Sequence, residues 1–221
     1  MLEHAHLAGK KGISQMTSKK KKPCLVSCSV LKKEIQKLVK RGDLDADLIF
    51  VNKFFHTEYA LLEKNLRRVL ERKPPRFSGR IVLVYGDLCL GLNNEMKELA
   101  KEYGVTKVNA ANCIDCLLGG NGKYFEVDPT HKLLLLDPGY IGIFKYWKEE
   151  ARREGIDEDT LRQVFNGLEG ILFLDTLGET EKNLAEIDKL EIGLPILETK
   201  EIGLDNLKMV ISEAIERDNN A

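Results

Sequence analysis

The sequence lacks the features of a membrane-bound or exported protein. None of its 221 residues lies in an apolar run of the roughly 20 residues that a membrane-spanning helix needs. The segment from Met1 to Gln15 contains no apolar stretch of the kind that a secretory signal requires. We therefore expect a soluble, cytoplasmic protein that has no membrane partner.

An excess of charge is also missing, because 34 basic and 35 acidic side chains leave a formal net charge of -1. A near-neutral chain has no global attraction to nucleic acid, so binding would need a local basic patch. The run from Lys19 to Lys22 is such a cluster, although a solvated tail is the simpler explanation. We expect no nucleic-acid partner.

Several common catalytic motifs are absent. The sequence contains no G-x-S-x-G elbow and no H-E-x-x-H pair, which argues against serine hydrolases and zincin proteases. Cysteine is scarce, with five residues, and a chain without an export signal rarely uses its cysteines as a disulfide framework. The five cysteines are therefore candidate thiols, metal ligands or redox groups.

Apolar runs alternate with amphipathic stretches from residue 23 onward. The first 22 residues have too little apolar periodicity to pack, so we predict a flexible tail at 1–22 and one folded domain at 23–221. Runs that are typical of buried strands lie at 24–28, 48–51, 81–85, 105–109, 132–136, 171–174 and 195–199. Such strands, separated by helices, predict an α/β fold with a mostly parallel, doubly wound, Rossmann-like sheet of about seven strands. Two smaller lobes are the alternative, with a seam near 119–131.

Four side chains that can bind metals follow successive predicted strands. Cys28 comes after the first strand, His56 lies beyond the second, and Cys89 and Cys113 follow the third and fourth. In a parallel sheet the carboxyl ends of the strands share one edge, and ligands bind there. Thiolates and an imidazole at one edge are typical ligands of zinc or of an iron–sulfur cluster. The sequence therefore predicts a metal site whose fourth position is left for His56, water or substrate.

Cys116 follows Cys113 in a C-x-x-C spacing, which occurs both in zinc sites and in thiol redox motifs. Cys116 is thus a further candidate metal ligand, and the pair is a candidate redox disulfide. Cysteine also packs as a small apolar residue, so Cys116 and Cys24 have a plain alternative role in the core. The spacing leaves these alternatives open.

Two acidic residues at predicted strand ends are candidate cofactor-binding groups. Asp137 and Gly139 follow one apolar strand and open a helix, and Asp175 ends another strand. Their position predicts a ligand-facing loop. Ordinary turn chemistry and N-capping are the alternatives. The Gly119 to Gly122 segment is likewise either a phosphate cradle or a plain turn.

A series of short motifs carries a family resemblance. In chain order they are Cys28-Ser29-Val30-Leu31-Lys32-Lys33-Glu34-Ile35, Phe55-His56, Tyr85-Gly86-Asp87-Leu88-Cys89, Cys113-Ile114 with Leu118-Gly119 and Tyr124, Leu136-Asp137-Pro138-Gly139-Tyr140, and Leu172-Phe173-Leu174-Asp175-Thr176. This order resembles the uncharacterised domain-of-unknown-function family sixteen-thirty-eight. The resemblance runs from about Cys24 to the C-terminus, and its specificity lies in the series.

The resemblance implies cysteines at the places of Cys28, Cys89 and Cys113 and a histidine at the place of His56. Family members usually carry His-Asp before the last of these cysteines, where this chain has Ala111-Asn112. If that histidine is a ligand in the family, this chain has lost it, and Cys116 is the candidate replacement. The family is often found with corrinoid-dependent methyltransferase systems, in methanogens and other microbes. This implies a corrinoid protein or a methyltransferase as partner, and a corrinoid bound through that partner.

These patterns together predict a metal-binding α/β protein with a role in corrinoid-linked methyl transfer or one-carbon metabolism. The metal is zinc or an iron–sulfur cluster, and the sequence does not choose between them. One alternative is a non-catalytic module that binds a corrinoid protein or a nucleotide. Another is a thiol redox protein that uses Cys113 and Cys116.

Overall fold

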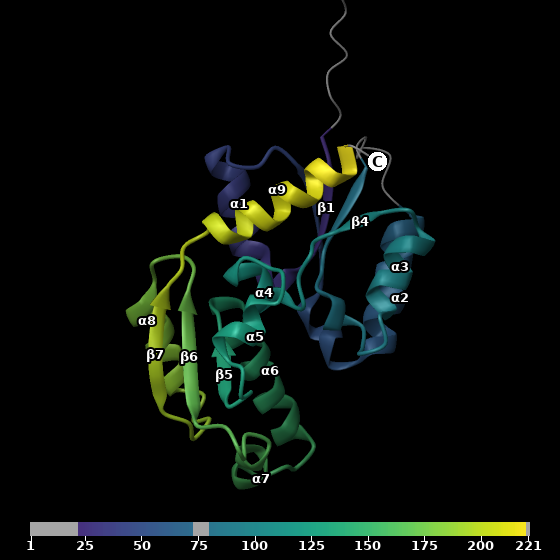
Figure 1. The fold of residues 1–221 in the computed structure, drawn as a ribbon. Helices are drawn as coiled ribbons and strands as arrows, with labels where there is room; N and C mark the ends of the chain where they lie inside the picture. Colours follow the sequence, from purple (N-terminus) through teal and green to yellow (C-terminus); the bar gives the residue numbers. More distant parts are fainter. Residues whose placement is uncertain (1–21, 73–79, 220–221) are drawn as a thin grey trace, which may run out of the picture.

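The computed structural model describes residues 22–72 and 80–219 and has an α/β fold (Figure 1). Seven strands in these residues form two separate sheets, and every strand pair is parallel. The first sheet has the order β2-β1-β3-β4, and the second has the order β5-β6-β7. The tail predicted for 1–22 lies outside the described residues apart from Lys22.

The strands and helices alternate along the chain as the sequence predicts. The first sheet contains β1 (Cys24–Cys28), β2 (Asp47–Val51), β3 (Ile81–Val84) and β4 (Thr106–Lys107), and the second contains β5 (Leu133–Leu136), β6 (Gly170–Asp175) and β7 (Ile196–Glu201). The longer helices are α1 (Lys32–Arg41), α2 (Tyr59–Glu71), α3 (Glu95–Glu102), α6 (Pro138–Arg153), α8 (Thr180–Asp188) and α9 (Asp205–Asn219). The shorter ones are η1 (Ser29–Leu31), η2 (Lys53–Thr57), η3 (Asp87–Cys89), α4 (Cys113–Leu118), α5 (Lys123–Val127) and α7 (Glu158–Gln163). Within the described ranges, no helix is both long and apolar enough to cross a membrane.

A single sheet of about seven strands is the wrong prediction, and the two-lobe alternative is the arrangement observed. β4 has only two residues, and α9 covers its outer side: Thr106 Oγ1 donates to Asp218 Oδ1 at 3.1 Å. Arg217 Nη2 also donates to the Lys107 carbonyl oxygen at 3.0 Å. β5 does not extend the first sheet beyond β4 and instead begins a second one.

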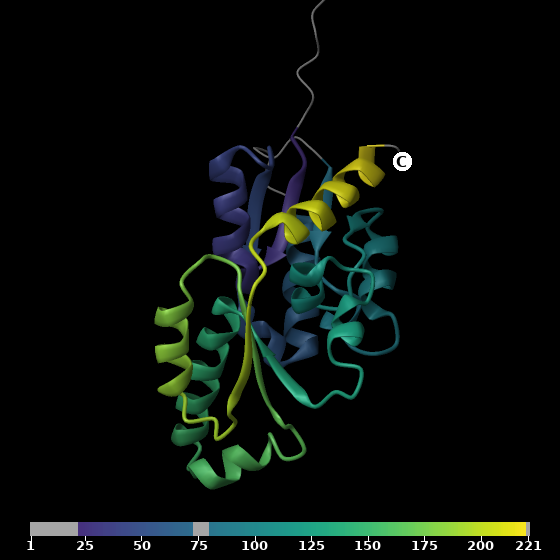
Figure 2. The same cartoon turned by 60° about the vertical axis from the view of Figure 1, so that its left-hand side comes forward.

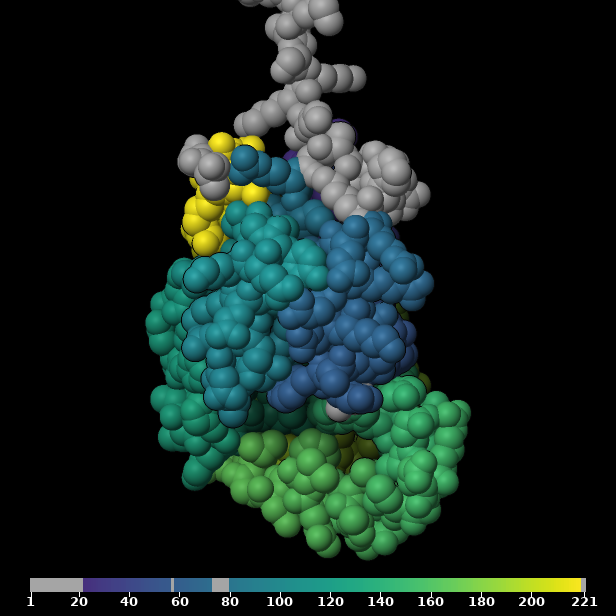
Figure 3. Space-filling model, turned by 90° about the vertical axis from the view of Figure 1, so that its right-hand side faces the viewer, coloured from purple at the N-terminus to yellow at the C-terminus, as the bar shows by residue number. Residues whose placement is uncertain are grey.

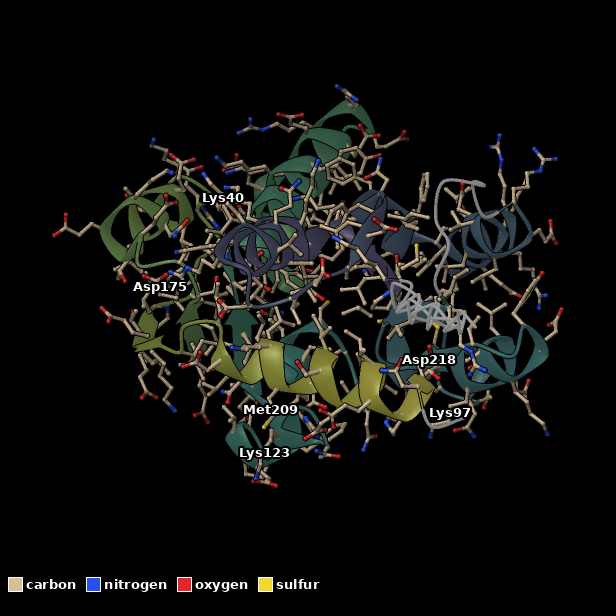
Figure 4. The ribbon with its side chains drawn as sticks, turned by 90° about the horizontal axis from the view of Figure 1, so that it is seen from above. Lys40, Lys97, Lys123, Asp175, Met209 and Asp218 are labelled. Carbon is tan, nitrogen blue, oxygen red and sulfur yellow. The ribbon has the colours of Figure 1, made fainter. Side chains whose placement is uncertain are left out.

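The C-terminal helix returns to the first sheet after the second sheet is complete. Leu207, Val210 and Ile211 of α9 are buried in the same apolar cluster as β1 and β3. Figure 2 shows the yellow α9 running across the first sheet, and Figure 4 places Asp218 at the end of α9 remote from Asp175. We therefore define the first lobe as residues 22–72 and 80–118 with α9, and the second lobe as residues 133–201.

Along β6 the side chains alternate between the two faces of the second sheet. Ile171 and Phe173 of β6 belong to a cluster with residues of α6 and α8, whereas Leu172 and Leu174 belong to a cluster with Ile114 of α4. Successive side chains of a strand point to opposite faces, so α6 and α8 cover one face and α4 and α5 the other. Since α4 follows β4, this packing fixes the second lobe against the first.

The carboxyl ends of the two sheets face each other. A Cβ atom on Gly139, just after β5, would overlap the carbonyl oxygen of Val30, just after β1. Thr176, just after β6, donates its hydroxyl to Glu34 Oε1 at 2.8 Å. The first sheet also reverses its strand order between β1 and β3, which is where open α/β sheets bind ligands. Both arguments place a site at the junction of the lobes.

Candidate functional site

Three thiols gather between the lobes, at the ends of three strands of the first sheet. Cys28 ends β1, Cys89 lies in η3 after β3, and Cys113 begins α4 after β4. All three are buried, with at most 8% of the side chain exposed. Burial raises the pKa of the Tyr85 phenol well above its usual range, and the charges of all three thiols raise it further. The three sulfur atoms therefore share the neighbourhood of one buried phenol.

The loop after β3 is held directly against the start of α4. Leu88 donates its backbone N–H to the carbonyl oxygen of Ala111 at 2.8 Å, and Asp87 donates to Ala110 at 2.9 Å. A Cβ atom on Gly86 would overlap the backbone of Ala111, so only glycine permits this approach. The close packing brings the segment of Cys89 beside that of Cys113.

Cys28 and His56 form a buried pair. Cys28 Sγ lies 3.8 Å from His56 Nδ1 and accepts a hydrogen bond from the Val30 backbone N–H at 3.5 Å. Burial lowers the pKa of His56 to about 4, so the imidazole is neutral at pH 7, and neutral imidazole is the form that binds metals. Burial also raises the pKa of the Cys28 thiol to about 12. His56 Nε2 is buried and has no hydrogen-bond partner in the described part of the chain.

The second lobe reaches the thiols through Tyr140 of α6. The Tyr140 hydroxyl lies 3.4 Å from Cys113 Sγ, and burial raises the pKa of that thiol well above its usual range. The Cys113 charge in turn raises the pKa of Tyr140. Burial raises the pKa of Cys89 to about 11. At pH 7 the group is therefore neutral, with protonated thiols and phenols.

Cys116 lies one helical turn beyond Cys113 and is completely buried in the core of the first lobe. Burial raises its pKa, with smaller contributions from the charges of Cys89 and Asp115. All five cysteines are in the thiol form.

Asp137 and Asp175 occupy equivalent positions after β5 and β6 but differ in their hydrogen bonds. Asp137 Oδ1 caps α6 by accepting the N–H groups of Gly139 at 2.5 Å and Tyr140 at 3.1 Å, whereas Oδ2 is buried without a partner in the described residues. Asp175 uses both oxygens: Oδ1 accepts from three backbone N–H groups of residues 177–179, and Oδ2 accepts from the Thr180 hydroxyl. Both carboxylate oxygens of Asp175 are thus engaged in capping, whereas Oδ2 of Asp137 accepts no hydrogen bond from the described residues.

The Gly119 to Gly122 loop binds a carboxylate of its own chain. Asp115 accepts the backbone N–H groups of Ala111 at 2.7 Å, Gly122 at 3.0 Å and Tyr124 at 2.8 Å. The other N–H groups of the loop, which a phosphate cradle would offer to a ligand, donate to the carbonyl oxygens of Asp115 and Asn109. The loop is therefore a turn held by Asp115.

Sequence reasoning missed Glu34 and Lys53 as members of this junction. Glu34 is 1% exposed and hydrogen-bonded across the lobes to Thr176. Lys53 Nζ donates to the carbonyl oxygen of Gly139 at 2.8 Å, again across the lobes. A signal for Glu34 was present, because it falls on the same helix face as Leu31 and Leu38, three and four residues away. A charged residue on an apolar face is expected only where it has a partner.

In this conformation, no group of three or more His, Cys, Asp and Glu side chains among the described residues stands close enough to hold a metal ion. The Cys28–His56 pair comes nearest to such spacing. Two ligands of one tetrahedral zinc ion, at about 2.3 Å for sulfur and about 2.0 Å for nitrogen, lie roughly 3.5 Å apart. The observed 3.8 Å is close to this value. In the view of Figure 3 a hollow separates the blue surface of the first lobe, near η2 and α2, from the green surface of the second.

The fold and the site define an α/β protein with two parallel sheets and a thiol-rich group at their junction. The family described as "Protein of unknown function (DUF1638)" matches residues 50–211. The chain therefore belongs to this family, which confirms the resemblance found in the sequence. The comparisons with curated proteins and with solved structures found no match.

Gly139→Ala is expected to destabilise the protein by about 3 kcal/mol, because the new methyl group overlaps the Val30 carbonyl oxygen and forces the lobes apart. Gly142→Ala on the same helix is the matched control. Its Cβ would meet only the flexible end of Lys53, so the expected cost is about 1 kcal/mol or less. Urea denaturation of both variants measures the difference, and equal costs would contradict the close approach of the lobes.

Proposed function

We propose that this protein binds one zinc ion between its lobes through Cys28, Cys89, Cys113 and His56. The observation that carries the proposal is the buried Cys28–His56 pair, whose Sγ and Nδ1 atoms are 3.8 Å apart. Cys89 and Cys113 belong to the same buried group and offer two further sulfur donors. Three thiols and one neutral imidazole match a Cys₃His zinc site, whereas a four-iron cluster usually takes four thiolates.

Protonation supports the same proposal. Burial alone keeps the thiols neutral at pH 7, with the pKa of Cys28 at about 12 and that of Cys89 at about 11. A divalent cation reverses this, because thiolate is the form that binds metal and the cation offsets its buried charge. Buried polar atoms without a partner often mark the place of a bound ion or water, and His56 Nε2 and Tyr85 Oη are two such atoms among the described residues.

Binding requires Cys89 and Cys113 to approach the Cys28–His56 pair. Cys89 ends η3 and Cys113 begins α4, and we propose that rotation about χ1 or a shift of these short segments brings the two thiols to the pair. Tyr140 contacts Cys113 from the second lobe, so we expect ion binding to tighten the contact between the lobes.

A role in corrinoid-linked methyl transfer is a further part of the proposal and rests on the family resemblance. A substrate thiol that took the position of His56 on the ion would lose its proton and become a thiolate, which is the form that accepts a methyl group. The corrinoid would then be carried by a partner protein. Co-elution of the zinc-loaded chain with a methylated corrinoid protein, and transfer of the methyl group to an added thiol, test this role. A corrinoid partner that binds the zinc-free chain equally well, without methyl transfer, would favour the non-catalytic binding module.

Elemental analysis of reduced protein purified without oxygen tests the zinc proposal. We expect about one zinc ion per chain for the wild type, and much less than one for Cys28→Ser. Cys24→Ala is the matched control, because Cys24 is buried at the opposite end of β1 and should leave the zinc content unchanged. If the analysis instead finds iron with labile sulfide, the bound group is an iron–sulfur cluster and not zinc. Wild-type protein free of both metals, which also fails to bind added zinc, would contradict the proposal, and a Cys113–Cys116 disulfide under mild oxidation would then favour the redox alternative.

A further inference from the structure

The second sheet ends in an open edge strand. β7 is the last strand of the order β5-β6-β7, so β6 is its one strand neighbour in the described part of the chain. Each of its six residues is exposed or only half-buried, whereas β6 is buried along its whole length. β7 lies at the outer margin of the second lobe in Figure 1, and Figure 2 turns this margin to the front. An edge strand of this kind presents N–H and C=O groups to any strand that can pair with it.

The hydrogen bonds to β6 fix which residues of β7 point outward. Ile202 donates its N–H to the carbonyl oxygen of Asp175 at 2.9 Å, directly after the pair formed by Asp175 and Glu201. Backbone groups of successive residues in a strand alternate in direction, so the N–H and C=O groups of Thr199 and Glu201 face away from β6. The register shift of this strand pair lies at the start of β7, which leaves the end of the strand regular.

The charges of β7 select one register for pairing with a second copy of the chain. Antiparallel strands exchange hydrogen bonds between outward-facing residues, so an odd-numbered residue of β7 must lie opposite an odd-numbered one. A register centred on Glu198, Lys200 or Glu201 sets that residue against itself, and like charges directly opposite destabilise a sheet. The register centred on Thr199 instead sets Glu198 opposite Lys200 of the second copy. The two-fold axis makes this favourable pair twice.

The side chains of β7 suit the same register. Glu198 and Lys200 lie on one face of the strand, where Oε1 and Nζ are 3.4 Å apart and the side chains are 54% and 42% exposed. Pairing would therefore place four charges of alternating sign along this face. On the other face Thr199 would meet Thr199 of the second copy, and threonine pairs across strands are favourable. Ile196, which is 40% exposed in the single chain, would lie opposite Ile202.

We propose that two copies of this chain pair through β7 in an antiparallel, two-fold arrangement centred on Thr199. The two three-stranded sheets then form one continuous sheet of six strands. Main-chain hydrogen bonds hold the pair together, and the Glu198–Lys200 contacts fix its register. The pairing does not depend on whether the junction of the lobes binds zinc.

Sedimentation equilibrium of the full chain in submillimolar solution tests the pairing. We expect a mass of about twice the 25.0 kDa of one chain. Thr199→Pro removes an N–H group that faces away from β6, so this variant should fold, because proline is tolerated in edge strands, but should lose the dimer. Circular dichroism checks that the variant is folded. A monomeric wild type, or a folded Thr199→Pro variant that is still fully dimeric, would overturn the proposal.

Charge reversal tests the register. Glu198→Lys sets lysine against lysine and Lys200→Glu sets glutamate against glutamate, at two positions each, so either change should weaken the dimer at least about tenfold. The double variant restores both opposite-charge pairs and should dimerise like the wild type. Glu126→Lys, which breaks the exposed pair with Lys123 on α5, is the matched control and should leave the dimer unchanged. Single variants that dimerise like the wild type, or a double variant that does not recover, would overturn the register centred on Thr199.

Discussion

Replacing Cys89 and Cys113 together by alanine is expected to weaken zinc binding by more than about a hundredfold, since loss even of groups that only orient a ligand weakens metal binding 10–100-fold. The two thiols reach the junction from η3 and α4, and both lie beside Tyr85. Without them only Cys28 and His56 remain at ligand spacing, and two donors do not hold a tetrahedral ion firmly. Competition against a chromophoric chelator measures the affinity.

The control for this double variant must also remove a buried thiol. Cys24→Ala does so at the far end of β1, and it should bind zinc with wild-type affinity while losing some stability through the smaller side chain. Both proteins are compared well below their unfolding temperatures, with circular dichroism to confirm that they are folded. An unchanged zinc affinity in the double variant would show that the thiols are core residues and form no site.

Asp137→Asn is expected to change how stability depends on pH. The pKa of Asp137 is about 7 in the folded chain against an ordinary value of 3.8, so the folded state holds a proton that the unfolded state releases. Its contribution to the free energy of unfolding is complete below pH 3.8 and is lost as the pH rises through about 7. The loss in the free energy of unfolding is on the order of 4 kcal/mol, and it does not occur in Asp137→Asn because asparagine does not titrate. Zinc-free Asp137→Asn should therefore gain stability relative to the wild type between pH 4 and pH 7.

The contribution of His56 to stability changes with pH in the opposite direction to that of Asp137. A pH series on the wild type alone would therefore hide the effect of Asp137. The pKa of His56 is about 4 in the folded chain against an ordinary 6.5, and its contribution to stability is present above pH 6.5 and lost as the pH falls to about 4. Urea denaturation at several pH values gives the free energy of unfolding of the wild type, Asp137→Asn and the control Asp175→Asn. The difference between the wild type and Asp137→Asn isolates the contribution of Asp137. A constant difference between the wild type and Asp137→Asn across this range would refute the raised pKa.

The strands were predictable because each is a continuous apolar run. β3 and β6 are buried along their whole length, which is the pattern that strands covered on both faces produce. Their division into two sheets was not predictable, because strand pairing depends on long-range packing such as the return of α9 to β3 and β4. The contacts of Thr106 with Asp218 span more than a hundred residues, and no local pattern encodes such a pairing.

The placement of Cys28, Cys89 and Cys113 at or just after the carboxyl ends of β1, β3 and β4 was predictable, since the carboxyl ends of parallel strands share an edge. Sequence reasoning missed Glu34 and Lys53 because their hydrogen-bond partners, Thr176 and the Gly139 carbonyl, lie in the second lobe, whose position on the first depends on tertiary packing. The contact of Asp137 with a cofactor stays a prediction; in the structure Oδ1 caps α6 and Oδ2 is buried without a partner among the described residues. Glu34 is a charged residue of a type that usually faces solvent, and only its place on the apolar face of α1 indicates that it is buried.

X-ray absorption at the zinc edge, on protein loaded with one equivalent of zinc, tests the convergence of the thiols most directly. The account predicts about three sulfur neighbours at about 2.3 Å and one nitrogen neighbour at about 2.0 Å. A first shell made of oxygen and nitrogen alone, or of a single sulfur, would contradict it.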